Sequence, residues 1–243
     1  MILRVMNDGP RPGTANMETD ARLLAEHCPG DDPILRLYRW SPWAVTYGYH
    51  QAPDTFDVAA AADRGWDVVR RPTGGRAILH AQELTYAVVG TSPCALFGDT
   101  LHQTYTTINR ALMKFLRELG LSPDVSDGES LEEARGAVCF QTAGRHEVTV
   151  GGRKIIGSAQ RRSGEVFLQH GSILTGSAHV DLLELLPSSE RTEGRRRELI
   201  TATTDLSREL GRELDDEDLD GLTDLLIASF AEVFFLETES VSL

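Results

Sequence analysis

The chain has 243 residues, 41% of them hydrophobic and 25% charged, which is the composition of a soluble globular protein with one large domain or a domain and a small appendage. A net charge of −13 excludes nonspecific nucleic-acid binding, because release of counterions from a polyanion requires a basic face. No apolar run approaches the ~20 residues of a membrane span, and Arg4 interrupts the region where a signal peptide needs an apolar core, so we expect a cytoplasmic protein with no membrane partner.

The first 119 residues alternate helical and strand patterns. Asn16 is the expected N-cap of the first helix, and the Pro- and Gly-containing segment 28–33 is expected to end it. The expected elements are a helix over 16–27, strands over 34–40 and 44–49, a short helix over 57–64, strands over 66–70, 76–79 and 84–89, and a long amphipathic helix over 100–119.

The second half begins with an acidic, polar loop over 126–135. Strands are expected over 147–150, 153–156 and 166–174, with a hairpin turn at Gly151-Gly152 and helices over 180–186 and 222–235. Strands at the centre and helices outside predict an α+β fold with a mixed, largely antiparallel sheet. We expect a catalytic domain over residues 1–187, a charged linker over 188–197, and a helical C-terminal extension over 188–243 packed on that domain.

Two glycine-containing segments carry basic residues. Arg71 and Arg76 flank the turn Pro72-Thr73-Gly74-Gly75, called the Gly-rich turn below, where the backbone N–H groups can approach a ligand without interference from a Cβ atom. Lys154 follows the Gly151-Gly152 hairpin, and the small residues 157–159 are expected to interrupt its strand where a chain or ligand lies close to the backbone. The basic residues of these segments are candidates for a positive mouth that attracts an anionic partner: Arg70, Arg71, Arg76, Arg153, Lys154, Arg161 and Arg162.

The chain has three cysteines, Cys28, Cys94 and Cys139, and their odd number and wide spacing argue against a disulfide framework and against a zinc site. We expect no bound metal. Cys139 follows the acidic loop and precedes the strand that carries Lys154. A thiolate near a lysine suits thioester exchange, because attack on a thioester yields another thioester and retains the energy of the acyl bond. An inert core cysteine and a solvated lysine are the alternatives at these two positions.

Several segments resemble the biotin/lipoate protein ligase superfamily. Residues 70–80 are similar to its R-R-x-x-G-G-x-x-x-x-H segment, and Lys154 to Gln160 resembles K-x-x-G-S-A-Q. Further similar segments are Asn16-Met17 with Asp20, residues 45–51, residues 82–86 and the Q-H-G-S-I-L strand at 169–174. The resemblance runs over residues 16–185 and implies the fold of a biotin-ligase or lipoate-ligase catalytic domain, with a tunnel for a fatty acyl chain.

Within the superfamily, the Cys139-Phe140 pair before Lys154 resembles the cysteine-dependent octanoyltransferases. This implies that Cys139 takes an octanoyl group from acyl carrier protein, that Lys154 lowers the pKa of the thiol, and that no cofactor is needed. The implied acceptors are apo lipoyl domains of the glycine-cleavage H protein or of 2-oxoacid dehydrogenase subunits. The implied substrate-binding residues are Arg71, Gly74, Gly75, His80, Gly157, Ser158, Ala159 and Gln160, with His80 also a candidate base or a structural residue.

Three other functions stay open. An ATP- and Mg-dependent lipoate–protein ligase is supported by Gly144-Arg145-His146-Glu147, which stands near a G-R-N-D-like segment of such ligases, and by Ala81, where both groups often carry aspartate. Against it, only about 55 residues follow the matched region, which is short for the additional domain of full-length ligases, although a two-chain ligase can lack that domain. An amidotransferase that moves lipoyl groups between lipoyl domains also uses a cysteine, whereas a non-catalytic lipoyl-binding module needs no nucleophile.

Overall fold

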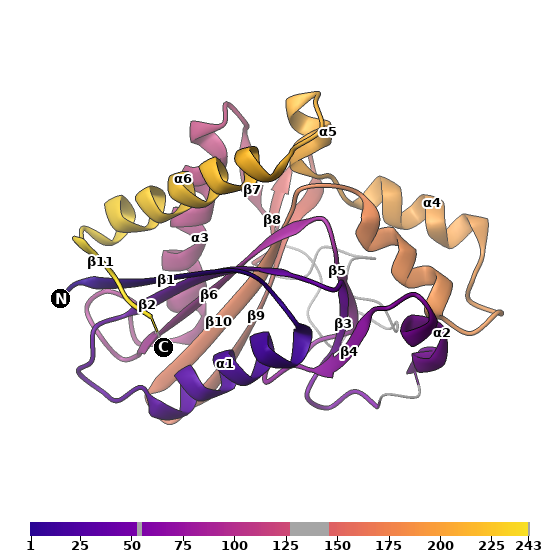
Figure 1. The fold of residues 1–243 in the computed structure, drawn as a ribbon. Coiled ribbons are helices and arrows are strands. Elements are labelled where there is room, and N and C mark those ends of the chain that lie inside the picture. The colour runs from indigo at the N-terminus through magenta and orange to yellow at the C-terminus, as the bar shows by residue number, and fades with distance from the viewer. Residues whose placement is uncertain (53–54, 127–145, 243) are drawn as a thin grey trace.

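A large mixed sheet forms the centre of the molecule, in a computed structural model that describes residues 1–52, 55–126 and 146–242 (Figure 1). Its strand order is β11-β1-β2-β6-β10-β9-β8-β7. The strands are β1 (Leu3–Arg11), β2 (Ile34–Trp40), β6 (Glu83–Thr91), β7 (Pro123–Val125), β8 (Val148–Val150), β9 (Arg153–Ser163), β10 (Val166–Leu174) and β11 (Thr238–Ser240). β1 pairs with β2 and β11 in parallel, and the other neighbours are antiparallel, which confirms the expected α+β fold with a largely antiparallel sheet.

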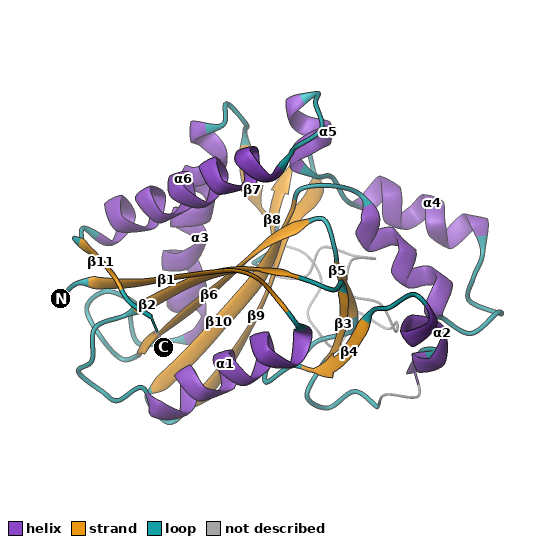
Figure 2. Ribbon diagram, viewed as in Figure 1, coloured by secondary structure: helices purple, strands orange, loops and turns teal. Residues whose placement is uncertain are grey.

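A second, smaller sheet lies beside the large one and carries the Gly-rich turn (Figure 2). It consists of β3 (Ala44–Tyr47), β4 (Asp67–Arg70) and β5 (Ile78–His80), with β3 in the middle. The helix α2 (Val58–Asp63), capped by Asp57, and the 3₁₀ helix η2 (Ala178–Leu185) pack on it around a separate apolar cluster. The Gly-rich turn connects β4 to β5. It faces the large sheet, because its Thr73 contacts His170 of β10.

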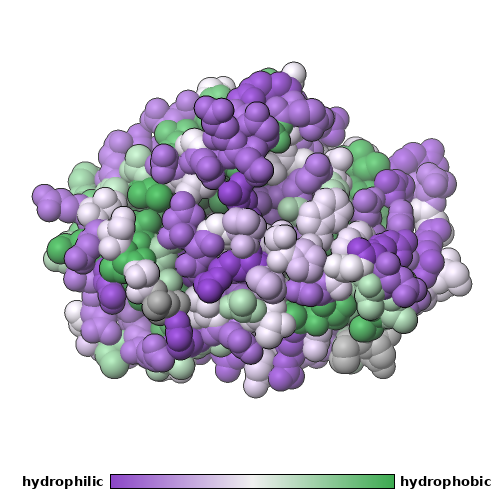
Figure 3. Space-filling model, in the orientation of Figure 1, coloured by the Kyte–Doolittle hydropathy of each residue, from purple (hydrophilic) through white to green (hydrophobic). Residues whose placement is uncertain are grey.

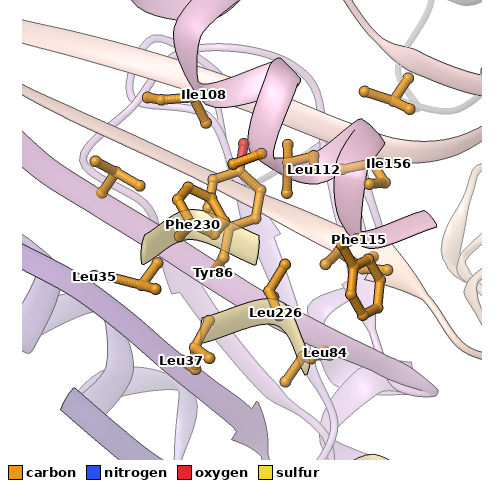
Figure 4. Packing of buried hydrophobic residues seen from close by; sticks show 14 of the residues in the cluster. Leu35, Leu37, Leu84, Tyr86, Ile108, Leu112, Phe115, Ile156, Leu226 and Phe230 are labelled. Carbon is orange, nitrogen blue, oxygen red and sulfur yellow. The ribbon is translucent and has the colours of Figure 1, made fainter. Parts of the chain in front are cut away.

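Alternation along β6 explains the layers on the two faces of the large sheet. Leu84, Tyr86 and Val88 point to one face, where the helices α3 (Leu101–Glu118) and α6 (Asp216–Phe234) close the main core (Figure 4). Ala87 and Val89 point to the other face, against α1 (Gly13–Glu26). Each face thus has its own apolar cluster, and a side chain on the sheet reaches either the α3 and α6 side or the α1 side.

Several expected boundaries differ from the observed ones. The first helix begins at Gly13, and Asn16 is a fully buried residue inside it that does not cap it. The strand with Lys154 is not interrupted at 157–159, because β9 pairs with β10 along that whole stretch. The expected linker over 188–197 includes the start of the helix α4 (Glu193–Ala202).

The C-terminal part continues with α5 (Leu206–Leu210) and α6 and ends in β11, which pairs with β1. α6 contributes Leu226 and Phe230 to the main core, in contact with the sheet and α3. The expected division after residue 187 stays a prediction. Every helix among the described residues is too short or too polar to cross a bilayer, and the face shown in Figure 3 is mostly hydrophilic, with scattered apolar groups.

Candidate active site

The Gly-rich turn is held through its carbonyl oxygens. The Pro72 carbonyl accepts from Arg161 Nη1 at 2.9 Å, and the Thr73 carbonyl accepts from the Tyr49 N–H at 2.9 Å. The Gly74 carbonyl accepts from Arg71 Nη2 at 2.8 Å and Nε at 3.1 Å. Within the described part of the chain, the N–H groups of Gly74 and Gly75 have no protein acceptor. The turn thus keeps two backbone donors for a ligand oxygen.

Glycine is required where the turn meets the end of β3. A Cβ atom on Gly48 would lie 1.9 Å from the Gly75 carbonyl oxygen, far inside van der Waals contact. Gly75 has φ +94°, a conformation that favours glycine, and a Cβ atom there would lie 2.6 Å from Arg71 Nη2. The two backbones therefore approach each other more closely than any side chain permits, and this contact sets the position of the turn.

Arg71 is buried under the turn, where it contacts the protein instead of solvent. Besides the Gly74 carbonyl, it donates to the Arg76 carbonyl at 2.8 Å and to Thr46 Oγ1 at 3.2 Å. The predicted substrate residues Arg71, Gly74 and Gly75 are thus brought together, with Arg71 placed as the support of the turn.

His80 is buried and forms contacts through each ring nitrogen. Nε2 lies 2.8 Å from Thr46 Oγ1, and Nδ1 lies 2.8 Å from Glu83 Oε1. The ring stacks on Trp40 with the centroids 4.0 Å apart. Burial by itself raises the pKa of Glu83, but its contact with His80 and the hydroxyl groups of Thr85 and Ser172 outweigh burial, so the pKa lies below its ordinary value.

A second buried carboxylate, Asp20, lies behind the turn on the α1 side. It accepts from His170 Nδ1 at 2.8 Å and from Arg36 Nη1 at 2.7 Å, and His170 Nε2 lies 2.6 Å from Thr73 Oγ1. Burial raises the pKa of Asp20, but the hydrogen bond from His170 and the charge of Arg36 outweigh burial, so this pKa is below its ordinary value. Burial lowers the pKa of His170, so its imidazole is neutral at neutral pH.

Lys154 lies on β9 with a 1% exposed side chain and forms an ion pair with Glu147. Its carbonyl accepts from the Thr204 N–H at 2.9 Å, which ties this part of β9 to the segment after α4. A buried ammonium requires such a partner, because an uncompensated charge is strongly destabilising in the interior. Lys154, which the sequence predicted as a site residue, is thus a buried cation. Its carboxylate partner Glu147 was not among the expected site residues.

The expected substrate residues on β9 are divided between the two faces of the large sheet. Ser158 Oγ lies 2.7 Å from the Tyr86 hydroxyl, which also accepts from Gln169 Nε2 at 3.1 Å, and Gln160 donates to Gln169 Oε1 at 3.1 Å. Tyr86 belongs to the core beneath α3 and α6, and burial raises its pKa to about 12. Ser158 and Gln160 therefore point away from the Gly-rich turn.

Gly157 and Ala159 alternate along β9 with these polar residues and lie on the other face of the sheet. Ala159 pairs with His170, whose ring contacts Thr73, so this position shares the face of the turn. Gly157 also lies close to a neighbouring backbone, because a Cβ atom on Gly171 would come within 2.5 Å of its carbonyl oxygen. Small residues at 157–159 thus mark a close approach, as expected, without a break in the strand.

Cys139, the predicted nucleophile, lies outside the described residues. The residues on either side of that gap are joined, since the Ser126 N–H donates to the Glu147 carbonyl at 2.9 Å and the His146 N–H donates to the Ser126 carbonyl at 3.2 Å. Glu147 is also the ion-pair partner of Lys154. The described residues that flank the gap are therefore hydrogen-bonded to each other, and Glu147 next to them contacts Lys154.

The basic residues do not form the single positive mouth that the sequence suggested. Arg161 and Arg162 are neighbours on a strand and point to opposite faces, Arg161 to the turn and Arg162 to Thr104 on α3. Arg153 pairs with Glu209. A smaller basic surface remains, in which the guanidinium groups of Arg70 and Arg161 lie 5.2 Å and 4.6 Å from the ring centre of the exposed Tyr49.

The predicted site residues did not include the polar residues that hold the turn, which are Asp20, Thr46, Thr73, Glu83 and His170, although Asp20, Glu83 and His170 lie in segments that resemble the superfamily. A signal for them was present in β10, where Gln169, His170 and Ser172 interrupt an otherwise apolar strand that is buried along its whole length. Buried polar side chains need hydrogen-bond partners, so such a strand indicates a polar network inside the fold. Among the described residues, no group of three or more histidine, cysteine or acidic side chains is arranged to hold a metal ion.

Known proteins are similar to this chain in sequence over most of its length. The profile of the lipoyl protein ligase A/B catalytic domain matches residues 12–231, across the expected division after residue 187. Octanoyltransferase LipM of Moorella thermoacetica is 40% identical over 187 residues, which are 75% of this chain and 68% of that protein. Octanoyltransferase LipM of Lysinibacillus sphaericus is 35% identical over 79% of this chain and 73% of that protein. The chain spans 61–68% of the length of four such relatives.

Solved structures give the same fold at lower sequence identity. Lipoate-protein ligase A bound with ATP is similar with a TM-score of 0.78 and 23% identity, covering 100% of this chain and 90% of that one. The bipartite lipoate protein ligase of Thermoplasma acidophilum is similar with a TM-score of 0.76 and 22% identity, covering 100% of this chain and 88% of that one. The match of the family profile over most of the chain, with relatives of 35–40% identity, establishes that this chain belongs to the lipoyl protein ligase A/B catalytic domain family.

Proposed function

We propose that this chain transfers an octanoyl group from acyl carrier protein to a lysine of an apo lipoyl domain, through a thioester on Cys139. The relatives named octanoyltransferase LipM support the reaction. The observation that carries the proposal is the Gly-rich turn, whose carbonyls are bound by protein donors while the N–H groups of Gly74 and Gly75 have no acceptor within the described residues. Such donors fit the oxygen of an acyl group, on which negative charge develops during transfer.

The transfer has two steps. In the first, the Cys139 thiolate attacks the carbonyl carbon of the octanoyl thioester, a new C–S bond forms, the C–S bond to the carrier breaks, and the carrier leaves as a thiolate. In the second, the neutral amine of the acceptor lysine attacks the new thioester, an amide forms, and the Cys139 thiolate is released while the amine gives up a proton. Because each step starts from a thioester, the reaction as proposed requires neither ATP nor a metal ion.

Lys154 supplies the positive charge for the Cys139 thiolate in this proposal. Glu147 holds the buried Lys154 side chain, and Cys139 lies between Ser126 and Glu147 in the sequence. A cation beside a thiol favours the thiolate. Lys154→Arg keeps the charge but replaces a compact ammonium by a planar fork that does not fit the same contacts. We expect a lower transfer rate and an altered pH profile for this variant, and an unchanged rate and profile would contradict the role of Lys154.

The proposed partners are octanoyl-acyl carrier protein as donor and lipoyl domains as acceptors, such as those of the glycine-cleavage H protein or of 2-oxoacid dehydrogenase subunits. The bipartite ligase of Thermoplasma acidophilum is described together with its E2 lipoyl domain, which supports this class of acceptor. A cytoplasmic location follows from these partners and is part of the same proposal.

The test is intact-mass spectrometry after incubation with octanoyl-acyl carrier protein in the absence of ATP. We expect a gain of ~126 Da, one octanoyl group, on the parent protein and no gain on Cys139→Ser, because only a cysteine nucleophile forms the thioester. Cys28→Ser and Cys94→Ser are matched controls that should still be acylated. Failure of the parent to gain mass, with ATP-dependent modification of a lipoyl domain by free octanoate or lipoate, would show a ligase instead.

A further inference from the structure

We propose that Asp20, His170, Glu83 and His80 are positioning residues, which hold the Gly-rich turn through two buried chains of carboxylate, histidine and threonine. This inference rests on the proposed function of the turn as the site of the acyl carbonyl. One hydrogen-bond chain reaches the turn through Thr73, and the other hydrogen-bond chain reaches it through Thr46 and Arg71. Together they join the small sheet to the large sheet and α1.

The first chain runs from α1 across β10 to the turn. The pKa of Asp20 lies below its ordinary value, and its carboxylate accepts from the Tyr38 hydroxyl at 2.9 Å and from Arg36. Asp20 is therefore ionised, and both of its oxygens are acceptors. His170 Nδ1 lies 2.8 Å from Asp20 and therefore carries the proton. His170 Nε2 is then an acceptor, and the Thr73 hydroxyl donates to it over 2.6 Å. The side chain of the second residue of the turn is thereby fixed to the large sheet.

The second chain runs from β6 through β5 and β3. Arg71 Nη1 donates to Thr46 Oγ1 over 3.2 Å, and in the proposed chain the Thr46 hydroxyl donates to His80 Nε2, which lies 2.8 Å away. His80 Nδ1 then donates to Glu83 Oε1 over 2.8 Å. Every donor points in the same direction, from the guanidinium to the carboxylate.

Arg71 connects this hydrogen-bond chain to the Gly-rich turn. The same guanidinium that contacts Thr46 donates to the carbonyls of Gly74 and Arg76, on either side of Gly75. These bonds hold the carbonyl oxygens toward the protein. The Gly75 N–H shares a peptide with the Gly74 carbonyl and is consequently directed away from Arg71, toward the place where the acyl oxygen binds in the proposed function. The Gly74 N–H shares a peptide with the Thr73 carbonyl, which the Tyr49 N–H holds.

The two hydrogen-bond chains also argue against His80 or His170 as the base that deprotonates the acceptor lysine. Each ring nitrogen of His80 and of His170 is occupied by a protein partner, so neither imidazole has a lone pair left to accept a proton from the acceptor lysine. Within the described residues, Glu83 Oε2 is buried without any partner, which is an unfavourable arrangement for folding alone. We infer that the network is retained for the geometry of the turn.

The kinetic test removes one threonine hydroxyl from each chain. Thr73→Val and Thr46→Val keep the shape of the side chain, and Thr73→Ser and Thr46→Ser keep the hydroxyl as matched controls. A small displacement of a catalytic donor is costly, so we expect kcat for octanoyl transfer to fall about 10- to 100-fold in the valine variants, with a larger change in kcat than in KM. The serine variants should recover most of the rate, and thermal unfolding should show that the valine variants are folded.

A parental kcat in both valine variants, with the parent enzyme active, would overturn this inference and leave the proposed function standing. A parent without octanoyl transfer would contradict the proposed function instead. If a valine variant does not fold, ¹⁵N NMR of the imidazoles in the parent protein decides the question independently of activity. We expect the hydrogen on Nδ1 for His80 and His170, and a hydrogen on Nε2 of either ring would refute the corresponding chain.

Discussion

Acidification should destabilise this protein through His179, a buried residue of η2. Burial lowers the pKa of His179 from its ordinary value of 6.5 to about 4, and Nε2 lies 3.1 Å from Thr203 Oγ1. Because the folded state resists protonation of this ring, the unfolded chain binds more protons below pH 6.5, and stability is lost as the pH falls from there toward 4. Between about pH 7 and about pH 4.5, linkage gives a loss of about 2–3 kcal/mol for this one residue.

The assay is urea unfolding of the parent and of His179→Gln, measured at about pH 7 and about pH 4.5. Glutamine can contact Thr203 but does not titrate, so the parent should lose about 2–3 kcal/mol more than the variant between the two pH values. Comparison of the two losses removes any effect of the substitution that does not depend on pH. Equal losses in the two proteins would refute the assignment of a neutral, buried imidazole at this position.

Three further predictions concern the site and its support. Gly48→Ala should lower octanoyl transfer by about 10²-fold, since its Cβ would lie 1.9 Å from a carbonyl of the Gly-rich turn, whereas Gly221→Ala on α6 meets open space and should keep the parental rate. Arg70→Glu should lower kcat/KM for an acidic carrier protein at about 20 mM salt, and this effect should disappear at about 0.5 M salt. Arg22→Glu on α1 makes the same change of charge and is the control. An effect of Arg70→Glu that does not depend on salt would argue against electrostatic attraction at a distance. Arg36→Met should reduce the free energy of unfolding by about 3–5 kcal/mol in chemical denaturation, because it leaves buried carboxylate and amide groups without their cation, and a loss below about 1 kcal/mol would contradict this.

The fold was largely predictable because its strands and long helices have clear periodicity. The helix at α3 shows this well: Ile108, Leu112 and Phe115 recur at helical spacing and are all buried against the sheet. The strand β9 was predicted too short, because small residues at 157–159 weaken a local strand pattern while pairing with β10 maintains it. Pairing with the next strand of the hairpin decides such cases, and the pattern within β9 alone does not show it.

The sequence predicted the glycines and the lysine of the candidate site, but not the residues that hold the Gly-rich turn in place. Gly74, Gly75 and Lys154 stand out in the sequence because their neighbours are distinctive. The contact between Asp20 and His170 joins residues that are 150 positions apart, so no spacing rule indicates it. The roles of Arg71 and His80 were likewise visible only in three dimensions, where their polar atoms are seen to face protein groups.

The pairing of β11 with β1 has a practical consequence for work with this protein. β1 would otherwise be an edge strand, with unpaired backbone groups that attract strands of other molecules. Residues 238–240 are exposed, short and acidic in part, so they close the sheet with a segment that is itself a poor template for further pairing. A truncation before Thr238, or a fusion that pulls this segment away, should therefore promote self-association of the sheet edge, which size-exclusion chromatography would detect.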